Sequence, residues 1–382
     1  MYLILYNIIN ISIAIQTLRQ VQDQNALCLD GTRASYYFEQ GYGDGADKYL
    51  IFFEGGGWIQ GFDEAEMLQQ AYDRSNTNMG SSKFQTATTQ MDGLFNRNQN
   101  VNVYFYNWNT IFVNYCDGTG HQGYRTEPLQ IKDKTIYIRG ELIFKSIFQE
   151  HMIKLSQARK IVVSGCSAGG LAVFSWVQYI RDHLPLNVQI LAAPDSGIFL
   201  DLQPYDGAQA ASDRRQKQYH KLANEEVDPL NEQCVKTYSN EKWKCHFAQY
   251  LLQFINVPVF IIQSLYDTSC IPNVLHIYSA NDYTLRRCDQ KERTCIEAMR
   301  KQIINLINDR KLSDAQTGAF GVACLEHCFT QKEIFYTTNW AIPYDSQWTI
   351  ANSLGYWMQN LEQNNIHIDN VYWPNNKGCS NI

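Results

Sequence analysis

The stretch KIVVSGCSAGGLAVFSWVQYIRDHL at residues 160–184 decides the fold that we expect for this chain. Its first six residues form a short run rich in β-branched side chains, which is typical of a buried strand. From residue 171 onward the apolar residues recur at helical spacing, and the pattern stops just before Pro185, where a helix has to end. Only small residues lie between the two parts, so the stretch predicts a strand, a tight turn and a helix.

Further strand-like runs occur along the chain, and most of them lead into glycines or polar residues. These runs are KYLIFFE at 48–54, VNVYFYNW at 101–108, VQILAAPD at 188–195 and VPVFIIQSLYD at 257–267. A second segment with helical character covers residues 136–152. Strands that alternate with helices predict the α/β class, with a mostly parallel central sheet flanked by helices. No repeat or Pro/Gly linker divides the chain, so we expect one domain.

The polar stretch at residues 201–243 has the least core-like composition. It is compatible with a helical cap over one end of the sheet, and equally with a solvated excursion on the surface. The sequence does not separate these two interpretations.

The overall composition excludes several classes of protein. Of the 382 residues, 45% are apolar and 18% are charged, and the net charge is −6. Such a chain can bury a large core and is not disordered. No block of lysine and arginine stands out, which argues against nucleic-acid binding. No apolar run reaches the roughly 18 residues needed to cross a bilayer, so we do not expect an integral membrane protein.

The N-terminus and the cysteines both indicate secretion. Residues 2–15 are largely apolar and precede Arg19, as in a secretory signal. We therefore expect a signal peptide over residues 1–18 and a mature domain over 19–382; the alternative is a buried N-terminal strand. The chain has eleven cysteines, a number typical of oxidising compartments. Two sequence-local pairs are candidate disulfides, Cys234 with Cys245 and Cys288 with Cys295, and we expect Cys166 to be an unpaired thiol.

Residues 165–169, GCSAG, match the G-x-S-x-G pattern of a nucleophile elbow. A sharp turn between strand and helix exposes the Oγ atom of Ser167, and only small neighbours fit there. The N–H group of Ala168 then lies at the start of the helix, where it can stabilise an oxyanion. The alternative is an ordinary glycine-rich turn, and Cys166 is a weaker candidate nucleophile because the elbow presents its central residue.

A second glycine cluster, EGGGW at residues 54–58, follows the first strand-like run. The HGGG-type loop of esterases has the same place in chain order and supplies oxyanion donors. We expect the N–H groups of Gly56 and Gly57 to be such donors. Trp58 and Tyr266 are candidates for the wall of the substrate pocket.

A serine nucleophile needs a histidine base and a carboxylate, and in this chain order the acid follows the serine and precedes the histidine. His327 is the preferred base because it lies in ACLEHC between two cysteines. Asp267 ends a strand-like run and is the preferred acid, with Asp195 as the alternative. A rival interpretation makes Cys324, His327 and Cys328 zinc ligands. It lacks a second ligand pair to complete the site, so we expect no metal.

The chain resembles the pectin acetylesterase/Notum family of secreted serine esterases. The segments that carry the resemblance run in family order across most of the mature chain. They are FFEGGGW (52–58), YNWN (106–109), YCDG (115–118), YIRGELIF (137–144), SGCSAGG (164–170), PDSGIFLD (194–201), SLYDTS (264–269) and CLEHC (324–328).

This resemblance implies an α/β-hydrolase fold, a triad of Ser167, Asp267 and His327, and ester hydrolysis without a cofactor. Plant-type members look like deacetylases of pectin, whereas Notum-type members remove a fatty acyl group from a secreted protein. Two departures stand out: Ile59 and Gln60 replace a family cysteine, and residues 119–122 replace a Ser/Phe-rich stretch.

We therefore expect a secreted serine carboxylesterase that removes acetyl groups from a cell-wall polysaccharide; the triple glycine favours this plant-type substrate. The alternatives are a Notum-like deacylase of long-chain acyl esters and an inactive carbohydrate-binding relative. The expected partner is an acylated polysaccharide or another acyl ester. The sequence leaves the oligomeric state and the acyl position open.

Overall fold

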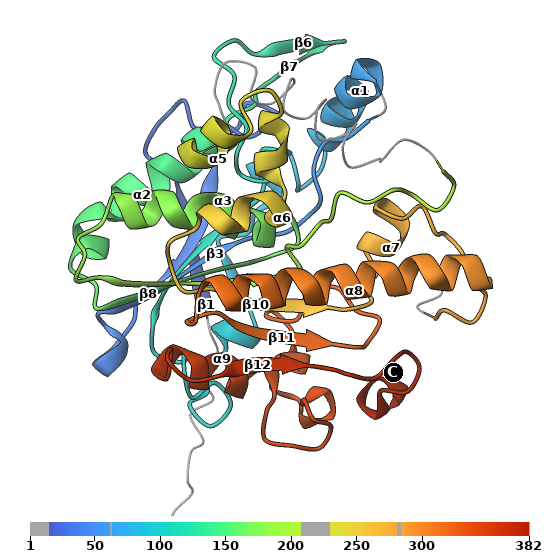
Figure 1. The fold of residues 1–382 in the computed structure, drawn as a ribbon. Coiled ribbons are helices and arrows are strands. Elements are labelled where there is room, and N and C mark those ends of the chain that lie inside the picture. Colours follow the sequence, from blue (N-terminus) through green and yellow to red (C-terminus); the bar gives the residue numbers. More distant parts are fainter. Residues whose placement is uncertain (1–14, 62, 208–229, 281–283, 382) are drawn as a thin grey trace, which may run out of the picture.

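The structure is a computed structural model that describes residues 15–61, 63–207, 230–280 and 284–381. A ten-stranded sheet runs through the middle of the molecule (Figure 1), in the order β12-β11-β10-β9-β8-β3-β5-β2-β1-β4. Its strands are β1 (Ile15–Gln20), β2 (Ser35–Glu39), β3 (Lys48–Phe53), β4 (Thr88–Gln90), β5 (Asn109–Val113), β8 (Lys160–Cys166), β9 (Gln189–Asp195), β10 (Phe260–Ser264), β11 (Gly318–Val322) and β12 (Asn365–Ile368). A separate hairpin consists of β6 (Leu129–Ile131) and β7 (Lys134–Ile136).

The strands from β12 to β5 pair in parallel, whereas β5, β2, β1 and β4 pair antiparallel. The described helices are α1 (Glu64–Arg74), α2 (Gly140–Ser156), α3 (Ala168–Asp182), α5 (Glu232–Thr237), α6 (Ala248–Leu251), α7 (Cys270–Asn273), α8 (Gln290–Ser313) and α9 (Ile350–Gln359). This arrangement confirms the predicted α/β class with a mostly parallel central sheet.

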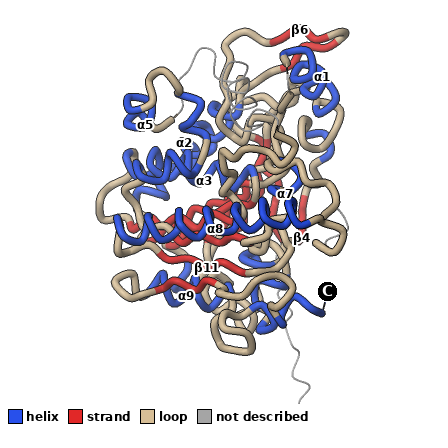
Figure 2. Tube along the Cα trace, turned by 45° about the vertical axis from the view of Figure 1, so that its right-hand side comes forward, coloured by secondary structure: helices blue, strands red, loops and turns tan. Residues whose placement is uncertain are grey.

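The sheet is buried on both faces at β8, as the alternate residues of this strand show. Ile161 and Val163 of β8 belong to the core that α2, α3 and α8 cover, whereas Val162 belongs to the core under α9. Figure 2 shows the strands between helix α8 and helix α9. A parallel sheet covered on both faces has continuous apolar strands, and this is why KIVV could be recognised from the sequence.

One predicted strand is wrong. Residues 101–108 form turns, and the neighbouring strand begins at Asn109. The side chain of Asn102 donates to the carbonyl oxygens of Leu94 and Asn96 and accepts from the N–H of Phe105. Such bonds between an asparagine side chain and nearby backbone compete with a strand, so the alternating apolar residues of this run do not enter the sheet.

The predicted leader and cap fall largely on residues outside the described ones, namely 1–14 and 208–229. Residues 15–18 belong to β1, where Thr17 faces Phe38 and Leu18 faces Tyr37. A leader that ended at residue 18 would remove the first four residues of this strand. None of the described helices is long and apolar enough to span a membrane.

The described cysteines form four disulfides. The predicted pair of Cys234 and Cys245 is confirmed. The predicted bridge between Cys288 and Cys295 is wrong, since both are thiols. Cys288 precedes Asp289, the N-cap of α8, and Cys295 is the sixth residue of that helix, so the helical rise carries Cys295 about 9 Å along the axis away from Asp289. A disulfide requires Cα atoms about 4.4–6.8 Å apart.

Candidate active site

Ser167 lies at the turn between β8 and α3, as predicted. Its backbone has φ 59° and ψ −120°, a strained conformation for a residue with a side chain and a frequent feature of functional sites. The residues next to Ser167 must be small because larger side chains would collide with nearby backbone. A Cβ atom on Gly169 would lie 2.0 Å from the carbonyl oxygen of Phe53, and one on Gly165 would lie 2.5 Å from that of Gly169.

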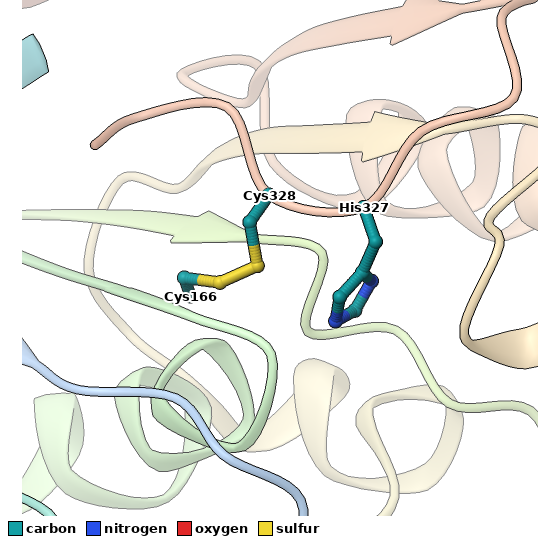
Figure 3. Close-up of side chains that lie close together, drawn as sticks. All are labelled: Cys166, His327 and Cys328. Carbon is teal, nitrogen blue, oxygen red and sulfur yellow. A yellow bond between two sulfur atoms is a disulfide. The ribbon is translucent and has the colours of Figure 1, made fainter. Parts of the chain in front are cut away.

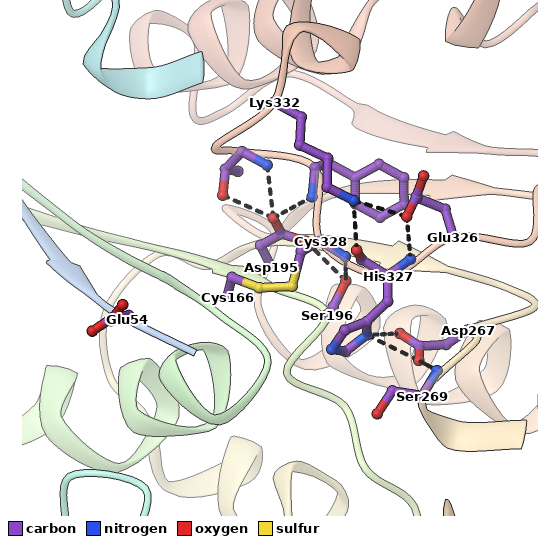
Figure 4. Close-up of a disulfide and its surroundings, with 12 residues drawn as sticks. Glu54, Cys166, Asp195, Ser196, Asp267, Ser269, Glu326, His327, Cys328 and Lys332 are labelled. Atoms are coloured by element: carbon purple, nitrogen blue, oxygen red, sulfur yellow. Dashed lines mark hydrogen bonds and ion pairs between the residues drawn. A yellow bond between two sulfur atoms is a disulfide. The ribbon is translucent and has the colours of Figure 1, made fainter. Parts of the chain in front are cut away.

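His327 and Asp267, the predicted base and acid, lie within hydrogen-bond distance of each other. The Nδ1 atom of His327 lies 3.0 Å and 2.9 Å from the two carboxylate oxygens of Asp267 (Figure 4). Asp267 is fully buried, and it also accepts hydrogen bonds from the N–H groups of Ser269 and Cys270 and from the Gln263 amide. Because the carboxylate accepts, Nδ1 carries the proton and Nε2 is left as a proton acceptor.

The pKa of His327 is raised from its ordinary value of 6.5. Burial acts to lower it, but the charge of Asp267 and its hydrogen bond outweigh burial, and the charge of Asp195 adds to them. The imidazolium is therefore stabilised where a base must receive a proton. Within the described residues no hydrogen bond joins Ser167 to His327; in proteins without bound substrate, the bond between a serine nucleophile and its base is often long.

The histidine loop, residues 324–330, is tied covalently to the nucleophile elbow. Cys166, the residue before Ser167, forms a disulfide with Cys328, the residue after His327 (Figure 3). The expectation that Cys166 is unpaired is therefore wrong. The side chain of Cys166 and that of Phe329 both belong to the core under α9. Because side chains alternate along β8, Cys166 faces the histidine loop, and the next residue, Ser167, begins the turn.

The same disulfide removes the zinc interpretation of this loop. A nitrogen of His327 and the sulfurs of Cys166 and Cys328 lie within 4.8 Å of one another, as metal ligands would. The two sulfurs are bonded to each other, and Cys324 is bonded to Cys379. Zinc binds thiolates, and none of these three cysteines can supply one in this state.

Asp195, the alternative acid, contacts the histidine loop rather than the imidazole. Its fully buried carboxylate accepts hydrogen bonds from the N–H groups of Phe329 and Thr330, 2.7 and 2.8 Å long, and from the Thr330 hydroxyl. Ser196 donates to Asp195 and accepts from the N–H of Cys328. Burial raises the pKa of Asp195, although these donors oppose the shift.

The glycine loop, residues 54–58, lies against the elbow. A Cβ atom on Gly55 would lie 3.1 Å from the Cβ atom of Ser167, and Gly56 and Gly57 have φ angles of 145° and 62°, which favour glycine. Among the described residues, no hydrogen bond engages the N–H groups of Gly56, Gly57 or Trp58. These groups remain available to a ligand.

The two predicted pocket residues lie in different surroundings. Trp58 is half-buried and packs edge-on against Phe199, with ring centroids 4.8 Å apart. Tyr266 is fully buried; its hydroxyl donates to Glu297 and accepts from the N–H of Trp373. The ring of Tyr266 therefore belongs to the core and does not line a pocket.

The sequence analysis gave no role to Glu54, the first residue of the glycine loop. Its carboxylate accepts a hydrogen bond from the N–H of Tyr115. Burial raises the pKa of Glu54 to about 7, against the effects of that bond and of the Arg74 charge. The sequence did offer a sign that Glu54 has a special environment, because this acidic residue stands directly between a buried strand and three glycines.

Comparison with known proteins decides the family. The family described as Pectinacetylesterase matches residues 7–380. The chain belongs to the pectinacetylesterase family. It is 28% identical over 372 residues to Pectin acetylesterase 5 of Arabidopsis thaliana, covering 94% of this chain and 83% of that protein. It is 30% identical over 249 residues to the palmitoleoyl-protein carboxylesterase NOTUM of Drosophila melanogaster, covering 63% of this chain and 36% of that protein.

A solved structure shares the fold of this family member. The Wnt deacylase Notum from Drosophila superposes with a TM-score of 0.78 at 22% identity, covering 94% of this chain and 97% of the other. The predicted resemblance to the pectin acetylesterase/Notum family and the predicted α/β-hydrolase fold are both confirmed.

Proposed function

We propose that this protein is a secreted serine carboxylesterase that removes acetyl groups from polysaccharide. The observation that carries the proposal is the contact of His327 with Asp267. His327 lies in a loop that is disulfide-bonded to the residue before Ser167. Membership of the pectinacetylesterase family supports the reaction class.

In the proposed reaction, the Oγ atom of Ser167 attacks the ester carbonyl carbon while Nε2 of His327 takes the hydroxyl proton. Asp267 stabilises the imidazolium that forms. N–H groups of the glycine loop and of Ala168 bind the oxyanion of the tetrahedral intermediate. The proton passes from His327 to the departing sugar oxygen. Water then attacks the acyl carbon while His327 takes one of its protons. The bond between the acyl group and Oγ of Ser167 breaks, His327 returns the proton to Oγ, and acetate leaves.

Two observations support acetyl esters over long-chain acyl esters. Pectin acetylesterase 5 of Arabidopsis is 28% identical to this chain over 94% of its length. The palmitoleoyl-protein carboxylesterases notum2 of Xenopus laevis and notum1a of Danio rerio match 93% and 95% of the chain at the lower identities of 25% and 26%. The triple glycine at residues 55–57 also resembles the plant-type branch.

Secretion is supported by the four disulfides, which persist in oxidising compartments. We place the end of a leader before Ile15 rather than at residue 18, because Gln16 is fully buried and Thr17 pairs with β2. The remainder forms a single esterase domain, since one sheet contains strands from both ends of the described chain.

Ser167→Ala tests the assignment. We expect turnover of p-nitrophenyl acetate to fall by at least about 10⁴-fold, because the variant has no nucleophile. Ser175→Ala is the matched control. This buried serine of α3 donates a hydrogen bond to the carbonyl oxygen of Leu171 in its own helix, and its loss should leave turnover unchanged. Unchanged turnover in Ser167→Ala would overturn the proposal.

The substrate class is tested with p-nitrophenyl esters of increasing chain length and with acetyl release from acetylated pectin and xylan. A maximum at acetate supports polysaccharide deacetylation. A maximum at long chains assigns a Notum-like deacylase instead. Binding of polysaccharide without any ester cleavage identifies an inactive carbohydrate-binding relative.

A further inference from the structure

The carbonyl oxygens of the glycine loop are held from behind by two side chains to which the sequence analysis gave no role. The Tyr115 hydroxyl donates to the carbonyl oxygen of Gly57, 2.6 Å away. The Nη2 atom of Arg74 donates to the carbonyl oxygen of Gly56, 2.8 Å away. We propose that Tyr115 and Arg74 are positioning residues of the oxyanion hole, which aim the loop's N–H groups by holding the carbonyl at the other end of each peptide unit.

The direction of the Tyr115 bond is fixed by its second partner. The N–H of Gly120 lies 2.8 Å from the Tyr115 oxygen, and a backbone N–H can only donate. The hydroxyl therefore accepts from Gly120 and has one proton to give, which goes to Gly57. Tyr115 is fully buried, so water does not compete for this bond. Gly120 lies in the 119–122 segment that departs from the family pattern.

The position of Tyr115 follows from strand pairing. β3 and β5 are parallel neighbours in which Phe53 faces Val113. Gly55 and Tyr115, each two residues beyond its strand, therefore leave the sheet at the same edge. A Cβ atom on Gly56 would lie 3.0 Å from the Tyr115 ring, so the glycine allows the close approach of ring and loop.

Arg74 completes the support from the end of α1. Its Nε atom donates to the carbonyl oxygen of Met79, and its guanidinium lies 4.8 Å from the centre of the Tyr115 ring. The ring of His121 stacks on the same Tyr115 ring, with the two ring centroids 4.6 Å apart. The Nε2 atom of His121 is hydrogen-bonded to the carbonyl oxygen of Glu54. The side chains that hold the loop thus contact one another and form a continuous support.

The consequence for catalysis follows from peptide geometry. In a planar trans peptide the N–H points opposite to the C=O. Holding the carbonyls of Gly56 and Gly57 therefore turns the N–H groups of Gly57 and Trp58 away from Arg74 and Tyr115. Those N–H groups have no partner among the described residues. Donors aimed in advance at a developing charge lower the activation barrier without reorganisation, so the support acts on the transition state more than on substrate binding.

Tyr115→Phe tests the proposal, which rests on the proposed function. The variant keeps the ring and removes one hydroxyl, and we expect kcat for p-nitrophenyl acetate to fall by about ten- to a hundredfold with KM nearly unchanged. This loss is smaller than the 10²–10³ typical for deletion of an oxyanion donor itself. Binding of phenylboronic acid, which forms a tetrahedral adduct on a serine, should weaken by a similar factor.

Tyr37→Phe is the matched control. Tyr37 is also buried and donates to a backbone carbonyl, that of Thr86, but it lies in β2 on the antiparallel side of the sheet. This variant should keep kcat and boronate affinity. Rates are normalised by active-site titration, so that partial unfolding of a variant does not mimic a loss of kcat.

A second variant covers the case in which Tyr115→Phe is unstable. Arg74→Gln removes the bond to Gly56 from the edge of the loop and should give the same split between kcat and KM. Wild-type kcat and boronate affinity in both folded variants overturn the inference while leaving the Ser167-dependent activity in place. Failure of the proposed function appears separately, as activity that survives in Ser167→Ala.

Discussion

The two loops that meet at Ser167 are held by different chemistry. The glycine loop, residues 54–58, is held by hydrogen bonds from Arg74 and Tyr115 to its carbonyl oxygens. The histidine loop, residues 324–330, is held by disulfides at Cys324 and Cys328 and by the buried carboxylate of Asp195.

This difference reflects what each loop contributes. In the proposed reaction the glycine loop offers backbone N–H groups, and its three glycines have no side chains, so that substrate can approach; the carbonyl groups of these glycines remain to be held. The histidine loop offers a side chain whose ring must keep one orientation. A covalent tie fixes the backbone on both sides of that ring, and a disulfide also disfavours the unfolded chain. Different variants should therefore impair the two loops in different ways.

The largest effect is expected where the acid meets the base. Asp267→Asn should lower kcat by about 10⁴-fold, because the amide favours the wrong tautomer of His327. Asp369→Asn is the matched control, since Asp369 is also buried and accepts from the N–H of Ala323 but does not contact His327. Near-normal activity of Asp267→Asn would show that another carboxylate orients His327.

The pH profile of the wild-type enzyme should reflect the contact between Asp267 and His327. His327 accepts a proton only when neutral, and its pKa is raised above 6.5. As pH falls through that raised pKa, the base becomes protonated and kcat/KM declines. We therefore expect an acid limb centred above pH 6.5. Residual activity of Asp267→Asn should have its limb at lower pH, and a limb that does not move would separate Asp267 from the titrating group.

The next effect is expected from opening the covalent tie of the histidine loop. In the double variant Cys166→Ala/Cys328→Ala, kcat should fall by about ten- to a hundredfold, because displacements of about 1 Å can cost that much. The control pair Cys234→Ala/Cys245→Ala opens a disulfide outside both loops, so it should lower the melting temperature and keep kcat. Equal kcat in the two double variants would show that the tie at Cys166 only stabilises the fold.

The smallest of these effects is expected from Asp195→Asn, at about tenfold in kcat, since the disulfide still holds the loop. The substitution also removes a negative charge that raises the pKa of His327. The acid limb should therefore move to lower pH, as in Asp267→Asn but by less. Thr330→Val removes one of the donors to Asp195 and keeps the charge, so its acid limb should stay in place.

Sequence patterns predicted the elements that are local in the chain. The β8–α3 unit was recognisable because β-branched residues, small turn residues and helical spacing occur within 25 consecutive positions, residues 160–184. The prediction of a strand at residues 101–108 was wrong because hydrogen bonds between the Asn102 side chain and nearby backbone outweighed the alternating apolar pattern. The pair of Asp267 with His327 was predicted from chain order, from the strand-like run that Asp267 ends and from the cysteines beside His327, and the structure brings the two residues into contact.

The sequence by itself determined the family, through short segments spread along the chain. It also determined the turn at Ser167 and the glycine loop, because each depends on a few adjacent residues whose size and polarity set the local backbone. Tertiary structure alone decided the disulfide between Cys166 and Cys328, which are 162 residues apart, and the contact of Tyr115 with Gly57. Asp195 likewise became a support of the histidine loop only in the fold. The order of strands in the sheet sets these contacts, and no spacing along the chain encodes which strands become neighbours.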